Sequence, residues 1–316
     1  MLPSFFFCQR LHEEEKTGKS IYYQKLTESS LMSQARERHS FNKTLIEKMF
    51  GGKMVTKIRC LKCLNISSRE EAFTDLSLAF PPPDRPVWRP RSTSVDTTKH
   101  PHLAFGKQTR TPKDSQSVSD LINYFLSPER LTAENQYHCE KCASLQDAEK
   151  VTELAEGPHY LILTLLRFSF DPQTMKRIKI LDSVSIPAVL ELPILVSPEE
   201  TEDICWHGKD AADLGSTFVP AVYDLCSVVV HSGITSQSGH YYCISRECTD
   251  TGPQAPPRDG TPKRASGKQL DSEIPWYFFN DATVSTHSFE SVSKLASLYP
   301  KDTAYVLFYR QREGSL

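Results

Sequence analysis

The sequence lacks any apolar run near the roughly 18 residues that a membrane-spanning helix requires. We also expect no secretory signal, since the apolar stretch Phe5–Phe7 is too short and no basic residue precedes it. Neither sign of charge dominates, because 37 lysines and arginines stand against 39 aspartates and glutamates. We therefore expect neither a nucleic acid nor a membrane as the partner.

A disulfide framework is absent as well. The chain has nine cysteines, an odd number that cannot all pair within the chain. Four of them form two CxxC pairs, Cys60 with Cys63 and Cys139 with Cys142. That arrangement differs from the cysteine spacing of small secreted domains. The sequence therefore predicts reduced thiols and a location in the cytoplasm, the nucleus or both.

Polar, proline-rich stretches divide the chain. Residues 81–115 combine clustered prolines with many Ser, Thr, Lys and Arg residues. Such a segment buries too little apolar surface to offset its ordering entropy, so we expect a disordered insertion there. Two further polar loops are expected at 197–218 and 249–272.

Short helices and many strands are predicted between these stretches. Leu45–Phe50 is a helix ended by two glycines. Ser117 and Asp120 form a capping-box pattern that opens a second helix with an apolar face. Alternating apolar and polar residues predict strands at 72–80, 160–170, 178–186, 223–230, 240–246, 276–280 and 303–309.

The paired CxxC motifs predict a zinc site. Zinc prefers four tetrahedral ligands, and each CxxC turn can place two sulfurs on one side of the metal. A zinc held by Cys60, Cys63, Cys139 and Cys142 would have no open position, which makes it structural. Two alternatives are unrelated CxxC pairs and a redox motif, although a redox CxxC usually opens a helix. The remaining cysteines have no ligand spacing: Cys8, Cys205, Cys226, Cys243 and Cys248.

A histidine at a strand start is the candidate for catalysis. Residues 223–243 form a strand, a Gly- and Ser-containing loop, and a second strand that opens at His240. A histidine held there keeps one ring edge open and suits a general base, provided that a third group fixes its tautomer. Asn280 and Asp281 follow an aromatic strand and can supply that group. The alternative is that His240 is an ordinary strand histidine whose ring nitrogens are hydrogen-bonded by neighbouring groups. The other histidine of this segment, His231, is predicted to be structural.

At these residues the sequence resembles the ubiquitin-specific proteases, papain-like deubiquitinating enzymes with thumb, palm and fingers subdomains. The segment from His231 to Tyr241 resembles their histidine box, and the CxxC pairs resemble their fingers zinc site. The resemblance implies an α+β fold with an antiparallel palm sheet, zinc-bearing fingers and a largely missing thumb. It covers about residues 45–80, 117–195 and 220–310. The implied subdomains are a thumb remnant (1–40), the fingers (41–80 and 116–158) and the palm (159–316).

The resemblance also implies a reaction and its partners. The family hydrolyses the isopeptide bond after the C-terminal glycine of ubiquitin, so ubiquitin and ubiquitinated proteins are the expected partners. His240 would be the base, Asn280 its orienting group and Asp281 an auxiliary. The Gly-Asn-Thr-Cys-like box of the nucleophile is absent, and Cys8 lacks that context. We expect an N-terminally truncated chain that is inactive alone; the alternative is a non-catalytic ubiquitin-binding or scaffold fragment.

Overall fold

The computed structural model describes residues 13–17, 43–82, 116–171, 175–196, 218–246, 275–290 and 300–312. The predictions for residues 83–115, for most of the two polar loops and for Cys8, Cys205 and Cys248 lie outside these ranges. Residues 13–17 are helical. No helix in the described ranges is long and apolar enough to cross a membrane. The elements are α2 (Leu45–Phe50), β1 (Gly52–Cys60), β2 (Ile66–Phe73), β3 (Leu76–Leu78), β4 (Gln116–Ser117), α3 (Val118–Phe125), β5 (Glu129–Leu131), η1 (Ala133–Asn135), β6 (Tyr137–Cys139), β7 (Ser144–Gln146), β8 (Ala148–Glu156), β9 (Tyr160–Leu165), β10 (Phe168–Asp171), β11 (Lys176–Lys179), β12 (Val184–Ser185), β13 (Val189–Leu195), β14 (Phe218–Ser232), β15 (His240–Arg246), β16 (Trp276–Asn280), β17 (Thr283–His287) and β18 (Asp302–Gln311).

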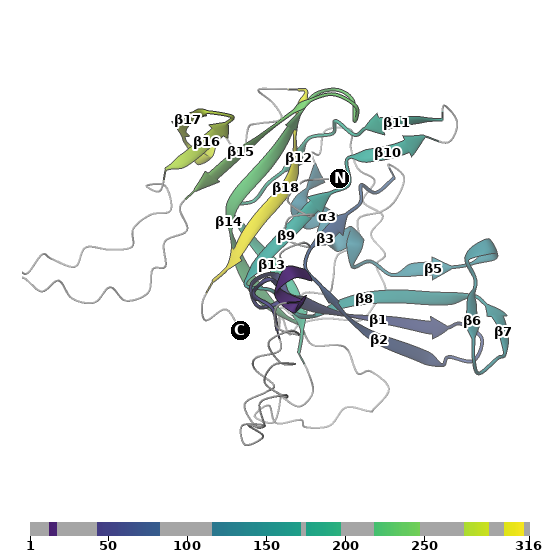
Figure 1. Ribbon diagram of the computed structural model, residues 1–316. Helices are drawn as coiled ribbons and strands as arrows, with labels where there is room; N and C mark the ends of the chain where they lie inside the picture. Colours follow the sequence, from purple (N-terminus) through teal and green to yellow (C-terminus); the bar gives the residue numbers. More distant parts are fainter. Residues whose placement is uncertain are drawn as a thin grey trace, which may run out of the picture.

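One sheet organises the molecule (Figure 1). Its order is β17-β16-β15-β14-β13-β8-β1-β2, with β18 paired to β14 and β9, β3 paired to β9, and β5 paired to β8. The strand β14 is 15 residues long and lies at the centre. Its first part pairs with β13, its last part with β15, and β18 follows most of its length. The pairing is antiparallel except where β3 meets β9 and where β13 meets β8.

The helix α3 contributes its apolar face to the hydrophobic core of this sheet. It begins where the capping box was predicted, since Asp120 N donates to Ser117 Oγ at 3.1 Å and Ser117 N donates to Asp120 Oδ2 at 2.9 Å. The core side chains come mainly from α3, β9, β14 and β18 and include Val118, Leu121, Ile122, Leu161, Leu163, Leu165, Val228, Val230, Leu307 and Tyr309.

Long strands carry the sheet outward to a tip. In Figure 1, β1, β2, β5 and β8 extend away from the central strands, and the small β6–β7 sheet lies at their far end. Oppositely charged side chains bridge β1 and β8, as in the pair of Lys53 and Glu156 at 3.4 Å. A mostly antiparallel sheet with a cysteine-bearing extension confirms the predicted fold class. The subdomain boundaries stay predictions.

The prediction of one strand over 72–80 was wrong. The strand β2 ends at Phe73 and β3 begins at Leu76, because the chain changes partner at this point. Residues up to Phe73 pair antiparallel with β1, whereas Leu76–Leu78 pair parallel with β9. A single strand cannot follow both partners.

The predicted strands over 160–170 and 178–186 are also each divided in two, and the same side chain lies at both breaks. Arg167 falls between β9 and β10 and is only 2% exposed. Its Nη1 donates to Ile180 O at 3.0 Å and to Asp182 O at 2.8 Å, in the gap between β11 and β12. A buried guanidinium has no water to donate to, so these two carbonyls accept its hydrogen bonds instead.

Candidate functional site

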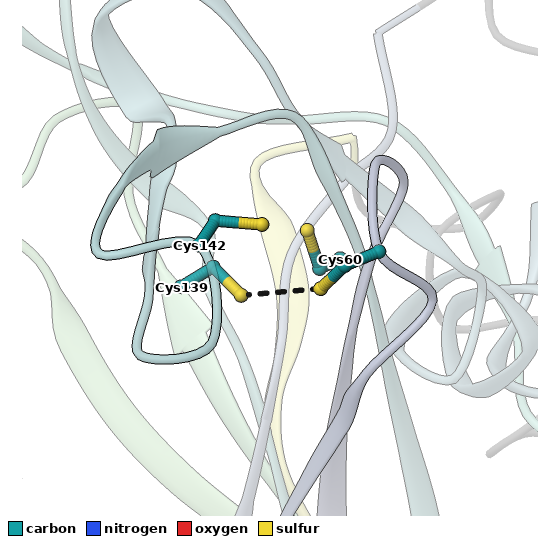
Figure 2. A group of neighbouring side chains, drawn as sticks. Cys60, Cys139 and Cys142 are labelled. Atoms are coloured by element: carbon teal, nitrogen blue, oxygen red, sulfur yellow. Dashed lines mark hydrogen bonds between the residues drawn. The ribbon is translucent and has the colours of Figure 1, made fainter.

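Four cysteine sulfurs gather at the tip of the extension. The Sγ atoms of Cys60, Cys63, Cys139 and Cys142 all lie within 4.8 Å of one another. In Figure 2 the sulfurs of Cys60, Cys139 and Cys142 point toward a common centre. A tetrahedral zinc with Zn–S bonds of about 2.3 Å separates its sulfurs by about 3.8 Å. The four thiols therefore suit a zinc ion in number, type and spacing.

The two CxxC turns are built in the same way. Cys60 is the last residue of β1 and Cys139 is the last residue of β6. The second cysteine of each pair lies in the turn that follows, and the next residue has a positive φ, 59° at Leu64 and 49° at Ala143. This left-handed residue reverses the chain after the second sulfur. The two turns thus present equivalent pairs of sulfurs to one point.

Local hydrogen bonds favour a thiolate at Cys60. Backbone groups of Cys63 and then Lys62, partly opposed by burial, lower the pKa of Cys60 to about 7. At Cys142, hydrogen bonding to Cys63 and burial raise the pKa instead. A metal ion takes all four sulfurs as thiolates and releases the remaining protons.

The structure brings His240 and Asn280 together at the other side of the molecule. His240 opens β15 and Asn280 ends β16, and these strands are antiparallel neighbours. His240 Nε2 lies 2.5 Å from Asn280 Oδ1. Because an amide oxygen only accepts, Nε2 is the donor, and in the neutral tautomer this leaves the lone pair on Nδ1. The imidazole is 46% exposed, so a substrate can reach it.

Asp281 is a weaker companion. Its Oδ2 lies 3.8 Å from His240 Nε2, beyond hydrogen-bond length, and its side chain is 82% exposed. It occupies the β16–β17 turn with a φ of 50°, a conformation that aspartate tolerates better than most residues. An exposed carboxylate at this distance adds little to holding the ring.

His231 is buried beside the site. It is 3% exposed, its ring lies 4.8 Å from that of Tyr241 and 5.4 Å from that of Phe168. Burial, and then the charge of Lys179, lower the pKa of His231, which favours the neutral ring. Nδ1 has no hydrogen-bond partner. These contacts are those of a packing residue and agree with its predicted structural role.

Neither described cysteine near the centre of the sheet is an activated thiol. Cys226 on β14 is buried, and its Sγ donates to Asp224 O at 3.4 Å. Cys243 on β15 contacts Ser227 Oγ at 3.1 Å, and burial raises the pKa of Cys243. A nucleophilic cysteine requires the opposite shift.

Comparison with known proteins identifies the family. The sequence matches the ubiquitin carboxyl-terminal hydrolase family over residues 5–309. The chain belongs to this family. The resemblance to ubiquitin-specific proteases drawn from the histidine box and the CxxC pairs is thereby confirmed.

Two relatives are ubiquitin carboxyl-terminal hydrolases by name. Human ubiquitin carboxyl-terminal hydrolase 35 is 41% identical over an alignment of 431 positions, which covers 97% of this chain and 39% of the relative. Ubiquitin carboxyl-terminal hydrolase 9 of Saccharomyces cerevisiae is 26% identical and covers 86% of the chain and 27% of the relative. The chain thus spans well under half the length of these relatives.

A solved structure shares the fold. The SAGA Ubp8/Sgf11/Sus1/Sgf73 DUB module bound to ubiquitin aldehyde contains a chain that is similar with a TM-score of 0.53 and 23% identity. The match covers 86% of this chain and 43% of that one. At this identity the likeness shows the fold of the hydrolase family.

The sequence did not predict one buried side chain, Lys179, beside the loop that leads to His240. Lys179 is buried, and its Nζ donates to the carbonyls of His231, Gly233 and Lys301. The only signal in the sequence is a lysine between two isoleucines at 178 and 180, which also fits an exposed strand position.

Proposed function

We propose that this hydrolase-family chain takes part in protein deubiquitination by cysteine-type hydrolysis of the isopeptide bond after the C-terminal glycine of ubiquitin. The observation that carries the proposal is the hydrogen bond from His240 Nε2 to Asn280 Oδ1 at 2.5 Å, in a chain of the ubiquitin carboxyl-terminal hydrolase family.

The geometry suits a base that works on a thiol. Asn280 holds the proton on Nε2, so His240 Nδ1 can accept the proton of a cysteine thiol. The thiolate then attacks the carbonyl carbon of the glycine. The C–N bond breaks, and His240 returns the proton to the departing lysine amine. Water hydrolyses the resulting thioester, which regenerates the thiol.

The described residues include no candidate for the nucleophile of this site. The sequence has no Gly-Asn-Thr-Cys-like box, and Cys243 has a raised pKa. We therefore propose that the chain as given supplies the histidine half of the site and turns over ubiquitin conjugates poorly alone. Cys8, the remaining thiol before the CxxC pairs, lies outside the described residues.

We assign the four cysteines at the tip to a structural zinc ion. Four thiolates leave no position for water or substrate, so the ion would hold the β1–β2 and β6–β7 turns together and take no part in the hydrolysis. Cytoplasmic or nuclear reducing conditions, which we also propose for this chain, keep such thiols available to the metal.

The second candidate function is binding of ubiquitin without cleavage. It is favoured by the absence of the nucleophile box from a chain that retains the fold of the family. The solved DUB module is bound to ubiquitin aldehyde, which shows that its chains hold a ubiquitin derivative. The two functions predict the same binding and differ only in turnover.

The test combines a binding and a turnover measurement. The purified chain is titrated with labelled ubiquitin and incubated with a fluorogenic ubiquitin substrate and a ubiquitin vinyl-sulfone probe. The variants His240→Ala and Cys8→Ala are compared with the control His287→Ala. His287 is an exposed histidine on β17 that is hydrogen-bonded to Ser285.

The outcomes separate the candidates. Binding without turnover supports the non-catalytic function of the chain alone. Turnover that disappears in Cys8→Ala would show that this thiol is a nucleophile after all. Turnover that His240→Ala retains refutes the base, and the absence of both binding and turnover refutes the proposed function.

A further inference from the structure

Lys179 is a buried cation with three backbone acceptors. It is 9% exposed, and its Nζ donates to His231 O at 2.9 Å, Gly233 O at 2.7 Å and Lys301 O at 3.0 Å. An ammonium group has three N–H donors, so all of them are used. Burial lowers the pKa of Lys179 to about 8, which leaves it charged at neutral pH.

The three acceptors belong to segments that converge next to the candidate base. His231 is near the end of β14, Gly233 begins the loop of residues 233–239, and Lys301 precedes β18. Gly233 N also donates to Lys301 O at 3.2 Å. Lys179 itself ends β11, so one side chain joins the β10–β11 pair to the 233–239 loop and to the turn before β18.

The far end of this loop rests on His231. A Cβ at Gly239 would overlap the His231 imidazole and lie 2.6 Å from Ser232 O, so only glycine fits. Gly233 has a φ of 147°, a conformation that favours glycine, and a Cβ there would come 2.8 Å from Ser238 O. Both ends of the loop are therefore fixed by close backbone packing, and His240 follows directly.

A second contact supports the same connection. Phe168 of β10 lies opposite Lys179 in the β10–β11 pair. Its ring meets the His231 ring edge-on, with centroids 5.4 Å apart. The β10–β11 pair thus contacts the end of β14 twice, through the Phe168 ring and through the Lys179 ammonium group.

We propose that Lys179 is a positioning residue: its ammonium group couples the β10–β11 pair to the 233–239 loop and thereby holds His240 in hydrogen-bond contact with Asn280. The residue touches no reacting atom and acts only through the loop backbone. The functional meaning of this inference rests on the proposed role of His240, whereas the mechanical coupling does not.

An apolar side chain could not replace the ammonium group. Three carbonyls that converge on one point repel one another and, when buried, require donors. Removal of the charge should therefore open the loop rather than leave a filled core. Lys179→Met keeps the length and the apolar stem, so it isolates the charge.

The test measures the loop and the ring separately. Amide hydrogen exchange is followed in peptides that cover the 233–239 loop and, as an internal reference, β1 and β8. The ¹⁵N shifts of the His240 ring report whether the proton stays on Nε2. The matched control is Lys176→Met, which removes an exposed lysine from the same strand. Labelled ubiquitin is titrated into each variant.

In Lys179→Met we expect loop amides to exchange at least about tenfold faster, with β1 and β8 unchanged. The two His240 ring nitrogens should shift toward a tautomer average, which a purely structural role would not produce. Lys176→Met should match the wild type in both respects. If Lys179→Met does not fold, Gly239→Ala loosens the other end of the loop and should give the same ring signature.

Two results would overturn the inference. One is that loop amide exchange and the His240 ring shifts in Lys179→Met equal those of the wild type. Where Lys179→Met does not fold, the same result in Gly239→Ala would count. The other is faster exchange throughout β1 and β8 as well, since this would reduce Lys179 to general stability. Failure of the wild type to bind ubiquitin would count against the proposed function and not against the coupling through Lys179. Amide exchange and ring shifts are measured without ubiquitin.

Discussion

Replacement of Cys60 by serine tests the metal site most directly. Cys60 is fully buried, and its sulfur lies within 4.8 Å of the other three. Serine keeps the size but is a poor zinc ligand, so the site loses one of its four bonds. Structural zinc supplies on the order of 10 kcal/mol of folding free energy. That is similar to the whole stability of a domain, about 5–15 kcal/mol.

The topology sets the scale of the effect to expect. The zinc would join turns that are separated by residues 64–138, and closure of a loop of that length costs about 4 kcal/mol. Without the metal, the β1–β8 ladder that ends at Cys60 and Ala148, extended by the bond from Leu61 N to Asp147 O at 2.9 Å, still holds the first turn close to the second, so about 4 kcal/mol is the largest entropic loss to expect. A loss of about 4 kcal/mol lowers Tm by about 10 °C in a protein of this size.

The assay is metal analysis together with thermal unfolding. The wild type should contain about one zinc per chain, and Cys60→Ser should contain close to none and unfold at a lower temperature. Cys226→Ser is the matched control, because Cys226 is also buried but lies on β14 away from the cluster. Full zinc occupancy in Cys60→Ser and Cys142→Ser, or an equal loss in Cys226→Ser, would refute the assignment.

Three further predictions concern pH and packing. The folded state holds His231 neutral because burial and then the charge of Lys179 lower its pKa, whereas the unfolded chain protonates this ring near pH 6.5. The unfolding free energy should therefore fall as the pH drops below about 6.5, and His231→Leu should show a shallower decline; urea unfolding at pH 7.5 and 5.5 measures both. The Tyr223 hydroxyl donates to a buried carbonyl at 2.8 Å, so Tyr223→Phe should lower the unfolding free energy by about 1–3 kcal/mol, and an unchanged urea midpoint would contradict this. Leu163→Ala should cost about 2–5 kcal/mol because Leu163 is fully buried, while Leu166→Ala, at 43% exposure, should cost under about 1 kcal/mol; similar losses in the two variants would argue against the described core.

Features set by short-range chemistry were predictable from the sequence. A Ser followed three residues later by Asp before an apolar run favours a capping box from local contacts alone, and α3 begins there. The CxxC spacing likewise fixes how two sulfurs leave a turn, so the cluster of four needed only the two turns to meet. His240 opens β15 and Asn280 ends the neighbouring β16, and a motif on each strand pointed to them.

Features set by distant partners were not predictable. Alternation alone favours Ile178 inside and Lys179 outside, but the structure has Ile178 46% exposed and Lys179 buried. The reversal depends on three carbonyls from segments 52, 54 and 122 residues away along the chain. Arg167 divides two predicted strands for the same reason, since its acceptors at 180 and 182 become visible only after folding.

The two candidate sites are built from different strands. The sulfurs lie at the outer ends of β1 and β6, whereas His240 and Asn280 lie on β15 and β16, beyond β13 and β14 in the strand order. The pairs that position His240 are β14 with β15 and β15 with β16, and none of them involves a strand that carries a cysteine ligand. A zinc ion at the cysteines would therefore stabilise the extension without binding to the strands that position His240. That separation allows the hydrogen bond between His240 and Asn280 and the cysteine cluster to form independently of each other.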